Sequence, residues 1–389
     1  MGYDFETWRP REGMASIKYE LAKKEGAPKG TLPLTIADME FKSPPEVIEA
    51  VTKIAESGMY GYGAADEEFK KAVVGWMHRR HGWQPKTEEM VMSPGIVGAL
   101  HSAVRAFTRR GERVLVHMPN YPAIFSVPRK MGRIVLENRL LNRGGRYELD
   151  LEDLRAKARL AKMMILCSPH NPCGRVWTRE ELLQMAEICY ENKVVLFVDE
   201  IHADIILPGF RQVAYGTLPA KYQTNALIAT SASKTFSLGG LSTSCIFLPD
   251  TGLRQRFAQQ MDLDGQYFVS VMGAVATRAG YENGDAWLDE MLLVLQKNYD
   301  ILKNYFLSSF PGVVLTPLEG TYLAWADFGP LGYGRQELDA RLREKAQFYA
   351  AHGEGYGAER EGYLRINLAC PTAQLEKMLK KIEETGVES

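Results

Sequence analysis

Short apolar runs alternate with longer amphipathic ones along most of the chain, and this alternation constrains the fold more than any other feature. Five runs predict buried strands, at residues 113–117, 163–167, 194–198, 226–230 and 245–248. Between them, apolar residues recur every three or four positions, as on a helix that packs against a sheet. The chain is therefore predicted to be α/β, with a mostly parallel sheet sandwiched by helices.

Two helices and a change of pattern complete the expected architecture. Thr178 and Glu181 form a capping box that opens one helix. A second helix is expected from Ile96 to about Arg110, with Gly111 as its C-terminal stop. From about residue 285 the pattern changes to a long helix and separate strands, which predicts a smaller α+β domain. The expected division is an N-terminal segment at 1–45 that joins the small domain, a large domain at 46–284 and the small domain at 285–389.

Charge and cysteine content narrow the function classes. The 389 residues carry a formal net charge of −1, which argues against a nucleic-acid footprint or a polybasic membrane surface. No apolar stretch reaches the roughly 18 residues that span a bilayer, and the first residues lack the apolar core of a signal peptide. The 5 cysteines show no metal-type CxxC spacing. We expect a cytoplasmic protein with free thiols, no metal site and a small-molecule ligand.

Lys234 closes the run SASK directly after an expected strand, where an amine can form a Schiff base if it is kept dry enough to lose its proton. Ser231 and Ser233 beside it could hold an anion such as a phosphate. The glycine turn SPGIVGAL could bind the same anion through the first helical amides, at Ile96 and Val97. A surface lysine and a plain turn-to-helix junction are the alternatives.

Further polar residues follow other expected strands, where open parallel sheets place their ligands. Tyr121 could cover a planar ring or be a buried loop tyrosine. Asn171, in an Asn-Pro-x-Gly turn, could donate to a phenolate oxygen or be purely structural. Asp199 ends an apolar strand and needs a cationic partner, such as a protonated pyridine nitrogen, or a backbone cap. His202 could reach the same ligand or simply complete the core.

Arg365 lies inside an apolar strand near the end of the chain. A buried guanidinium calls for a bidentate carboxylate, which a substrate or an internal Asp or Glu could supply.

Taken in order, these motifs resemble the pyridoxal-phosphate enzymes of fold type I over about residues 30–370. Within that superfamily, LTIADMEF at 34–41, MYGYG at 59–63, CSPHNPCGRVWTREEL, VDEIHAD and INLACP resemble the cystathionine beta-lyase subgroup of the aminotransferase-like carbon-sulfur lyases. DEIH is the most discriminating motif, because ordinary aminotransferases usually carry tyrosine at the position of His202.

The resemblance implies a role for each site residue. Lys234 would bind the aldehyde of pyridoxal phosphate and then act as the general base at the substrate Cα, with Tyr121 stacked on the ring as a second catalytic residue. Asp199 would keep the pyridine nitrogen protonated. Asn171 would donate to the ring phenolate oxygen and border the substrate, with His202 nearby.

The resemblance also implies how phosphate, substrate and a second subunit are bound. Arg365 would bind the substrate α-carboxylate, helped by the backbone near Ala37. Tyr62 would reach the phosphate and substrate of a neighbouring subunit, which implies a homodimer with shared active sites. The phosphate would be held by Ile96, Val97, Ser231 and Ser233.

Two positions depart from the usual patterns. Ser242 stands where aminotransferases usually place an arginine against the phosphate, and this favours a lyase. His352 stands where the family usually has a proline, which suggests a reshaped loop and bears on substrate preference. The expected function is β-elimination from cystathionine or a related cysteine S-conjugate. The alternatives are an aminotransferase and a regulatory protein that binds pyridoxal phosphate.

Overall fold

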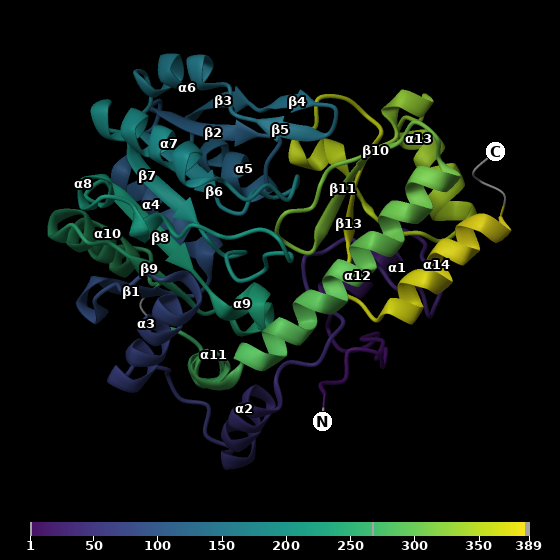
Figure 1. Cartoon of the computed structure of the whole chain (residues 1–389). Coiled ribbons are helices and arrows are strands. Elements are labelled where there is room, and N and C mark those ends of the chain that lie inside the picture. The colour runs from purple at the N-terminus through teal and green to yellow at the C-terminus, as the bar shows by residue number, and fades with distance from the viewer. Residues whose placement is uncertain (1, 267, 386–389) are drawn as a thin grey trace.

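The computed structural model describes residues 2–266 and 268–385. A seven-stranded sheet lies at the centre of its larger half (Figure 1). All five predicted strands lie in this sheet, within one residue of their predicted bounds. Its strands are parallel except that β9 runs antiparallel to both β8 and β1. The order across the sheet is β1 (Met90–Ser93), β9 (Ser244–Phe247), β8 (Ala226–Thr230), β7 (Val195–Asp199), β6 (Met163–Cys167), β2 (Arg113–Met118) and β3 (Ile134–Arg139).

The sheet is buried on both faces, as its nearly continuous apolar strands predict. Neighbouring residues of β2 show the two faces, because Val114 and Val116 lie in one hydrophobic cluster and Leu115 lies in the other. Helices α4 (Ile96–Phe107), α5 (Pro122–Lys130) and α10 (Thr251–Leu263) share the first cluster. Helices α3 (Glu67–His81), α6 (Leu151–Ala158), α7 (Arg179–Glu191) and α11 (Val271–Asn283) pack in the second.

The two helix predictions have different outcomes. Helix α7 begins where expected, with the Thr178 side chain accepting from the Glu181 amide and the Glu181 side chain accepting from the Thr178 amide. The prediction that α4 runs to Arg110 is wrong, because it ends at Phe107. Thr108 leaves the helix in an extended conformation while its hydroxyl donates back to the Val104 carbonyl. Gly111 serves the following turn instead, at a φ of 84°.

A smaller antiparallel sheet lies beside the first in the other half of the molecule (Figure 1). Its order is β10 (Val314–Leu315), β11 (Leu323–Asp327), β13 (Tyr363–Asn367) and β12 (Ala351–His352). The predicted long helix is α12 (Asp285–Ser309), which runs from the large half toward the small one, and it contacts α14 (Thr372–Glu384). The predicted domain limits at 45 and 284 stay a prediction.

The N-terminal region joins the small sheet. Helix α1 (Ile17–Lys24) is followed by residues 34–40, and Leu34 pairs with the small half through Tyr349 and Asn367. Helix α2 (Pro45–Ser57) then leads into the large half and packs against α11. The short elements are the hairpin β4 (Leu141–Arg143) and β5 (Arg146–Glu148), and the helices α8 (Ala220–Gln223), α9 (Ala232–Thr235) and α13 (Arg335–Leu338). Among the described residues, no helix is long and apolar enough to cross a membrane.

Candidate active site

A cavity of about 280 Å³ lies at the carboxyl ends of the parallel strands β6 and β7. Open α/β sheets place their ligands at this edge. The structure brings together here most of the residues that the sequence singled out. The predicted residues that line the cavity are Ala37, Ile96, Val97, Tyr121, Asn171, Asp199, His202, Ser233 and Lys234.

Lys234 lies on the short helix α9, which follows directly from strand β8. Its Nζ donates to the Ala37 carbonyl oxygen at 2.6 Å, and the Tyr322 hydroxyl donates to the same oxygen at 3.0 Å. Burial lowers the pKa of Lys234 from 10.5 to about 8, while Asp38 and Asp199 act to raise it and Arg365 acts to lower it. An amine with this pKa holds its proton loosely enough to act as a base or a nucleophile near neutral pH.

Asp199 is the last residue of β7, and its carboxylate is buried at the edge of the cavity. Burial raises its pKa to about 6, although the Ile201 amide donates to Oδ1 at 3.1 Å and Lys234 favours the charged form. The hydrogen bond from a backbone amide that the sequence suggested is therefore present. It does not offset the effect of burial on the pKa of Asp199. A cationic ligand in the cavity would stabilise the charge.

Arg365 projects from β13 of the small sheet and is buried. It donates to the Thr35 carbonyl at 2.7 Å and to Asn171 Oδ1 at 3.2 Å, and its guanidinium lies 4.5 Å from the centre of the Tyr356 ring. Its Nε has no hydrogen-bond partner within the described part of the chain. Burial lowers its pKa, and the groups that oppose this are tyrosines rather than carboxylates. The internal Asp or Glu considered from the sequence is thus absent among the described residues.

Three polar side chains border the same space. Tyr121 precedes α5 and is 37% exposed. Asn171 binds Arg365, so its amide connects the large and small halves at the cavity. His202 packs edge-on against Tyr322 with ring centres 6.0 Å apart, and burial, Lys234 and Arg365 hold its pKa well below the usual value. Among the residues described, its Nδ1 has no partner.

The start of α4 forms one wall of the cavity. Gly95 precedes the helix at a φ of 94°, a conformation that favours glycine, and so presents the first amides at Ile96 and Val97. Ser233 and Ser242 line the cavity as well. Ser231 lies outside this lining, because its hydroxyl is 2.7 Å from the Thr243 carbonyl and accepts from the Ser233 amide. That hydroxyl is used to hold the turn that carries Lys234.

Three other predicted positions lie outside the cavity lining, and of these Arg365 is linked to it through its hydrogen bond to Asn171. Tyr62 is 85% exposed and stacks on Phe268 with ring centres 4.5 Å apart. Its predicted reach to a neighbouring subunit stays a prediction. His352 ends β12, and its Nε2 lies 2.9 Å from Asp339 Oδ1. The substitution at this position thus makes a contact within the small half of the molecule.

The sequence reasoning missed three residues that contact or act on this site. Tyr322 shares an acceptor with Lys234, and Tyr356 lies under the guanidinium of Arg365. Nothing in the local sequence distinguishes these tyrosines from core aromatic residues. Asp38 acts electrostatically on Lys234 and sits in the largely apolar run LTIADMEF. Asp38, like Asp199, is a carboxylate in an apolar run and therefore requires a partner.

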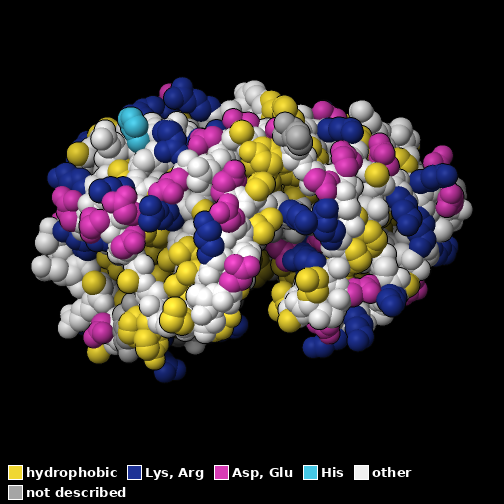
Figure 2. Space-filling view, turned by 90° about the horizontal axis from the view of Figure 1, so that it is seen from below, with side chains coloured by type: hydrophobic (Ala, Val, Ile, Leu, Met, Phe, Trp, Pro, Cys, Tyr) yellow, Lys and Arg dark blue, Asp and Glu magenta, His cyan; other side chains and the backbone are white. Residues whose placement is uncertain are grey.

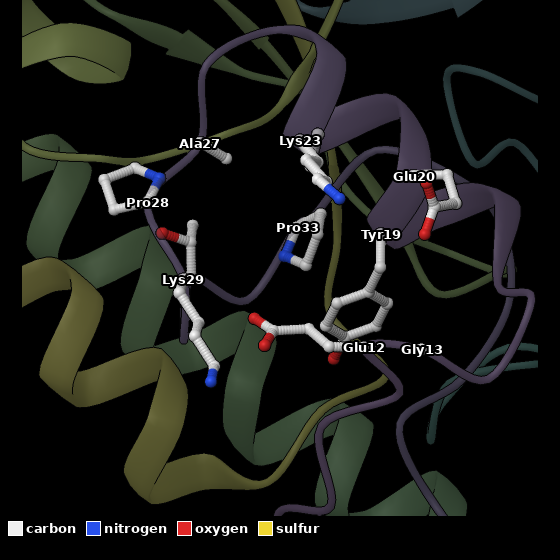
Figure 3. A pocket seen from close by; sticks show the side chains of 11 residues that line it. Glu12, Gly13, Tyr19, Glu20, Lys23, Ala27, Pro28, Lys29 and Pro33 are labelled. Carbon is white, nitrogen blue, oxygen red and sulfur yellow. The ribbon is translucent and has the colours of Figure 1, made fainter.

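A second cavity of about 400 Å³ lies away from these residues, beside α1 in the N-terminal region (Figure 3). Charged side chains, including Glu12, Lys23 and Lys29, stand around it. It contains none of the predicted site residues, so we place the chemistry at the smaller cavity. In the part of the chain that the structure describes, no group of three or more His, Cys, Asp or Glu side chains could hold a metal ion.

Comparison with known families accounts for this arrangement. The model of the family described as aminotransferase class I and II matches residues 29–382. The chain belongs to this family. The resemblance seen in the sequence motifs is confirmed, and the family match spans both halves of the structure.

Several individual proteins are similar to this chain over nearly its whole length. The chain is 35% identical to the cystathionine beta-lyase PatB of Bacillus subtilis, over 98% of this chain and 99% of that protein. Its fold matches cystalysin from Treponema denticola, a structure that contains pyridoxal 5'-phosphate, with a TM-score of 0.95 and 33% identity over 99% of both chains. It also matches the pyridoxal-phosphate-bound carbon-sulfur lyase from Staphylococcus hominis, with a TM-score of 0.89 and 29% identity over 99% of this chain and 98% of that one.

The buried amine of Lys234 predicts a pH-dependent cost to stability in the cofactor-free protein. Below pH 8 the folded and unfolded states both carry the charge, so the lowered pKa costs the folded state about 3 kcal/mol. As the pH rises from 8 toward 10.5 the folded state loses its proton first and this cost disappears. Lys234→Met should therefore raise the free energy of unfolding by about 1–3 kcal/mol at pH 7 and by much less at pH 10.

Urea unfolding at the two pH values measures this difference. Lys162→Met, at an exposed lysine, is the matched control and should change neither value. A destabilised Lys234→Met protein at pH 7, or an equal gain at both pH values, would contradict the burial argument.

Proposed function

We propose that this protein is a pyridoxal-phosphate-dependent carbon-sulfur lyase that cleaves cystathionine or a related cysteine S-conjugate to a thiol, pyruvate and ammonia. One observation carries the proposal. Lys234 and Asp199 line the cavity, Arg365 donates to Asn171 in its wall, and none of the three forms an ion pair among the described residues, although Asp199 and Arg365 are buried and Lys234 is partly buried. Buried charges cost several kcal/mol unless they are paired, so a ligand of matching charges is expected there. The names of the similar proteins support the same chemistry.

The chain's residues suit pyridoxal phosphate group by group. Lys234 supplies the amine for the aldehyde, and Asp199 supplies a carboxylate for a protonated ring nitrogen. Tyr121 offers an aromatic face to the ring. The first amides of α4 and the hydroxyls of Ser233 and Ser242 offer donors for the phosphate. When bound, this cofactor supplies a ring that withdraws electrons from the substrate Cα.

The substrate amino acid would be held by its α-carboxylate. Arg365 has an Nε without a partner and a fork of donors that matches a carboxylate. Asn171 and the Thr35 carbonyl fix the guanidinium from two other sides. With the carboxylate held there, Lys234 would act as the general base that removes the Cα hydrogen.

Elimination occurs if the group on the substrate Cβ leaves before the proton that was removed from Cα is added back at another atom. A thiolate is such a leaving group, and water then converts the remaining three-carbon fragment to pyruvate and ammonia. Two residues favour this outcome over transamination. His202 stands where aminotransferases usually carry tyrosine, and Ser242 stands where they usually carry arginine. Both residues line the cavity.

We also propose that the protein works as a homodimer. Exposed apolar side chains include Met59 and Tyr60, which precede Tyr62 in the sequence, Phe268, which stacks on it, and Ile48 of α2. Figure 2 looks onto the side of the molecule that carries α2 and shows hydrophobic side chains gathered in several patches there. Exposed apolar patches of this kind mark protein interfaces. The 5 free cysteines, all buried, support a reducing compartment such as the cytoplasm.

The product balance separates the lyase from the aminotransferase. With cystathionine or another cysteine S-conjugate as substrate, thiol, pyruvate and ammonia should appear in equal amounts without any added keto acid. Coupled assays for each product measure this ratio. A requirement for 2-oxoglutarate, with the carbon-sulfur bond left intact, would identify an aminotransferase instead.

The unpaired guanidinium predicts a selective loss of substrate binding. Arg365→Ala should raise KM at least about thirtyfold, because the substrate carboxylate loses a charged hydrogen-bonded partner. Arg365→Lys should recover only part of the loss, because a lysine lacks the planar fork. Steady-state kinetics on both variants test this, with the exposed Arg113→Ala as the control. An unchanged KM would show that Arg365 is structural.

Shared active sites predict complementation between inactive subunits. In an equal mixture of Tyr62→Phe and Lys234→Ala proteins, one site of each hybrid dimer has both native residues, so about a quarter of the wild-type activity should return. Lys234→Ala mixed with Arg365→Ala is the control, because both residues serve the same subunit's cavity. Its activity at low substrate should not exceed that of the Arg365→Ala protein alone. If the first mixture also stays inactive after verified subunit exchange, Tyr62 does not act across an interface.

A further inference from the structure

Four charged residues of the N-terminal region form a cluster beside the cavity, and we call Arg11, Lys18, Asp38 and Glu40 the N-terminal charge cluster. Arg11 donates to both carboxylate oxygens of Asp38, at 3.0 and 3.1 Å, and to Glu40 at 2.6 Å. Lys18 Nζ lies 2.8 Å from Glu40 Oε1 and 3.2 Å from Asp38 Oδ1. Each cation therefore pairs with both anions, and the formal charges cancel.

The inner half of the cluster is buried, whereas the side chains of Arg11 and Asp38 are 28% and 27% exposed. The side chains of Lys18 and Glu40 are 1% and 0% exposed. Glu40 Oε2 also accepts from the Tyr19 hydroxyl at 2.8 Å. Buried ion pairs add little net stability but strongly resist the removal of one partner. Such a cluster therefore fixes the geometry of whatever backbone carries it.

That backbone is the part of the chain that touches Lys234. Asn367 Nδ2 donates to the Ile36 and Asp38 carbonyls, at 2.7 Å each, and Lys18 Nζ donates to the Asp38 carbonyl at 3.3 Å. The Ala37 carbonyl lies between these two anchored carbonyls. Its position against Nζ of Lys234 is thus held from α1 on one side and from the end of β13 on the other.

The Asp38 carboxylate also acts electrostatically on Lys234. Of the charges that act on the pKa of Lys234, Asp38 has the largest effect and raises it, ahead of the lowering by Arg365 and the raising by Asp199. Lys234 in turn acts on His202. Burial raises the pKa of Asp38 itself, but Lys18 and Arg11 more than offset this and leave it lowered. The carboxylate therefore remains ionised at neutral pH.

We propose that Asp38 is a positioning residue for Lys234: clamped by Arg11 and Lys18, it fixes the Ala37 carbonyl against Nζ and supplies the main counter-charge of that amine. The proposal rests on the proposed function only in taking Lys234 as the reactive amine. It assigns a role in the site to the N-terminal helix, whose own residues do not line the cavity. The cavity-lining carboxylate of Asp199 is then left free to serve a ligand.

The pH dependence of Lys234 labelling tests this directly. The full-length, cofactor-free protein is labelled with trace acetic anhydride at several pH values, and the Lys234 peptide is quantified by mass spectrometry. Asp38→Asn removes the charge but keeps the shape, so the pKa of Lys234 should fall. Labelling at pH 7 should rise by about threefold or more, since only the neutral amine reacts.

Glu40→Gln is the matched control, because it removes one carboxylate from the same cluster without being among the groups that act on Lys234. It should destabilise the protein at least as much in thermal unfolding yet leave Lys234 labelling unchanged. Asp38→Glu should restore the wild-type labelling curve, and Asp38→Ser replaces Asp38→Asn if the latter does not fold. The proposal is overturned if Asp38→Asn leaves labelling unchanged or if Glu40→Gln raises it equally. Because no substrate is used, failure here and failure of the lyase assignment are distinguishable.

Discussion

The burial of unpaired charge around one cavity is the constraint on which the rest of this structure depends. Asp199 and Arg365 are buried, Lys234 is partly buried, and the pKa values of all three shift toward the neutral form because desolvation has the largest effect. Asp199 and Lys234 lie at the carboxyl ends of strands β7 and β8, whose other side chains are almost wholly apolar. A ligand that supplies the missing charges removes this unfavourable free energy. The same buried groups therefore favour ligand binding and have the shifted pKa values that catalysis uses.

The arrangement requires both halves of the molecule. The parallel sheet delivers Asp199 and Lys234 at the ends of β7 and β8, whereas Arg365 comes from β13 of the small antiparallel sheet. Residues 34–40 run between them and supply the Ala37 and Thr35 carbonyls that hold Lys234 and Arg365. The N-terminal charge cluster anchors this segment from outside the cavity. A site built this way depends on contacts between residues more than 190 positions apart in sequence.

That separation explains which features could be predicted from the sequence and which could not. The strands and the capped start of α7 were predictable because local pattern and hydrogen bonding decide them. The end of α4 was missed because the Thr108 hydroxyl turns back to Val104, a side-chain choice that apolar periodicity does not reveal. Tyr322 and Tyr356 could not be identified because only the tertiary fold brings them to Ala37 and Arg365. Asp38 was within reach, since a carboxylate in an apolar run requires a partner.

The central claim is that Lys234 is the amine to which pyridoxal phosphate attaches. Borohydride reduction of the protein loaded with this cofactor, followed by peptide mapping, tests it most directly. The lowered pKa and the position of Nζ in the cavity predict one modified peptide, which contains Lys234. Attachment at any other lysine, or no attachment after reconstitution, would contradict the account.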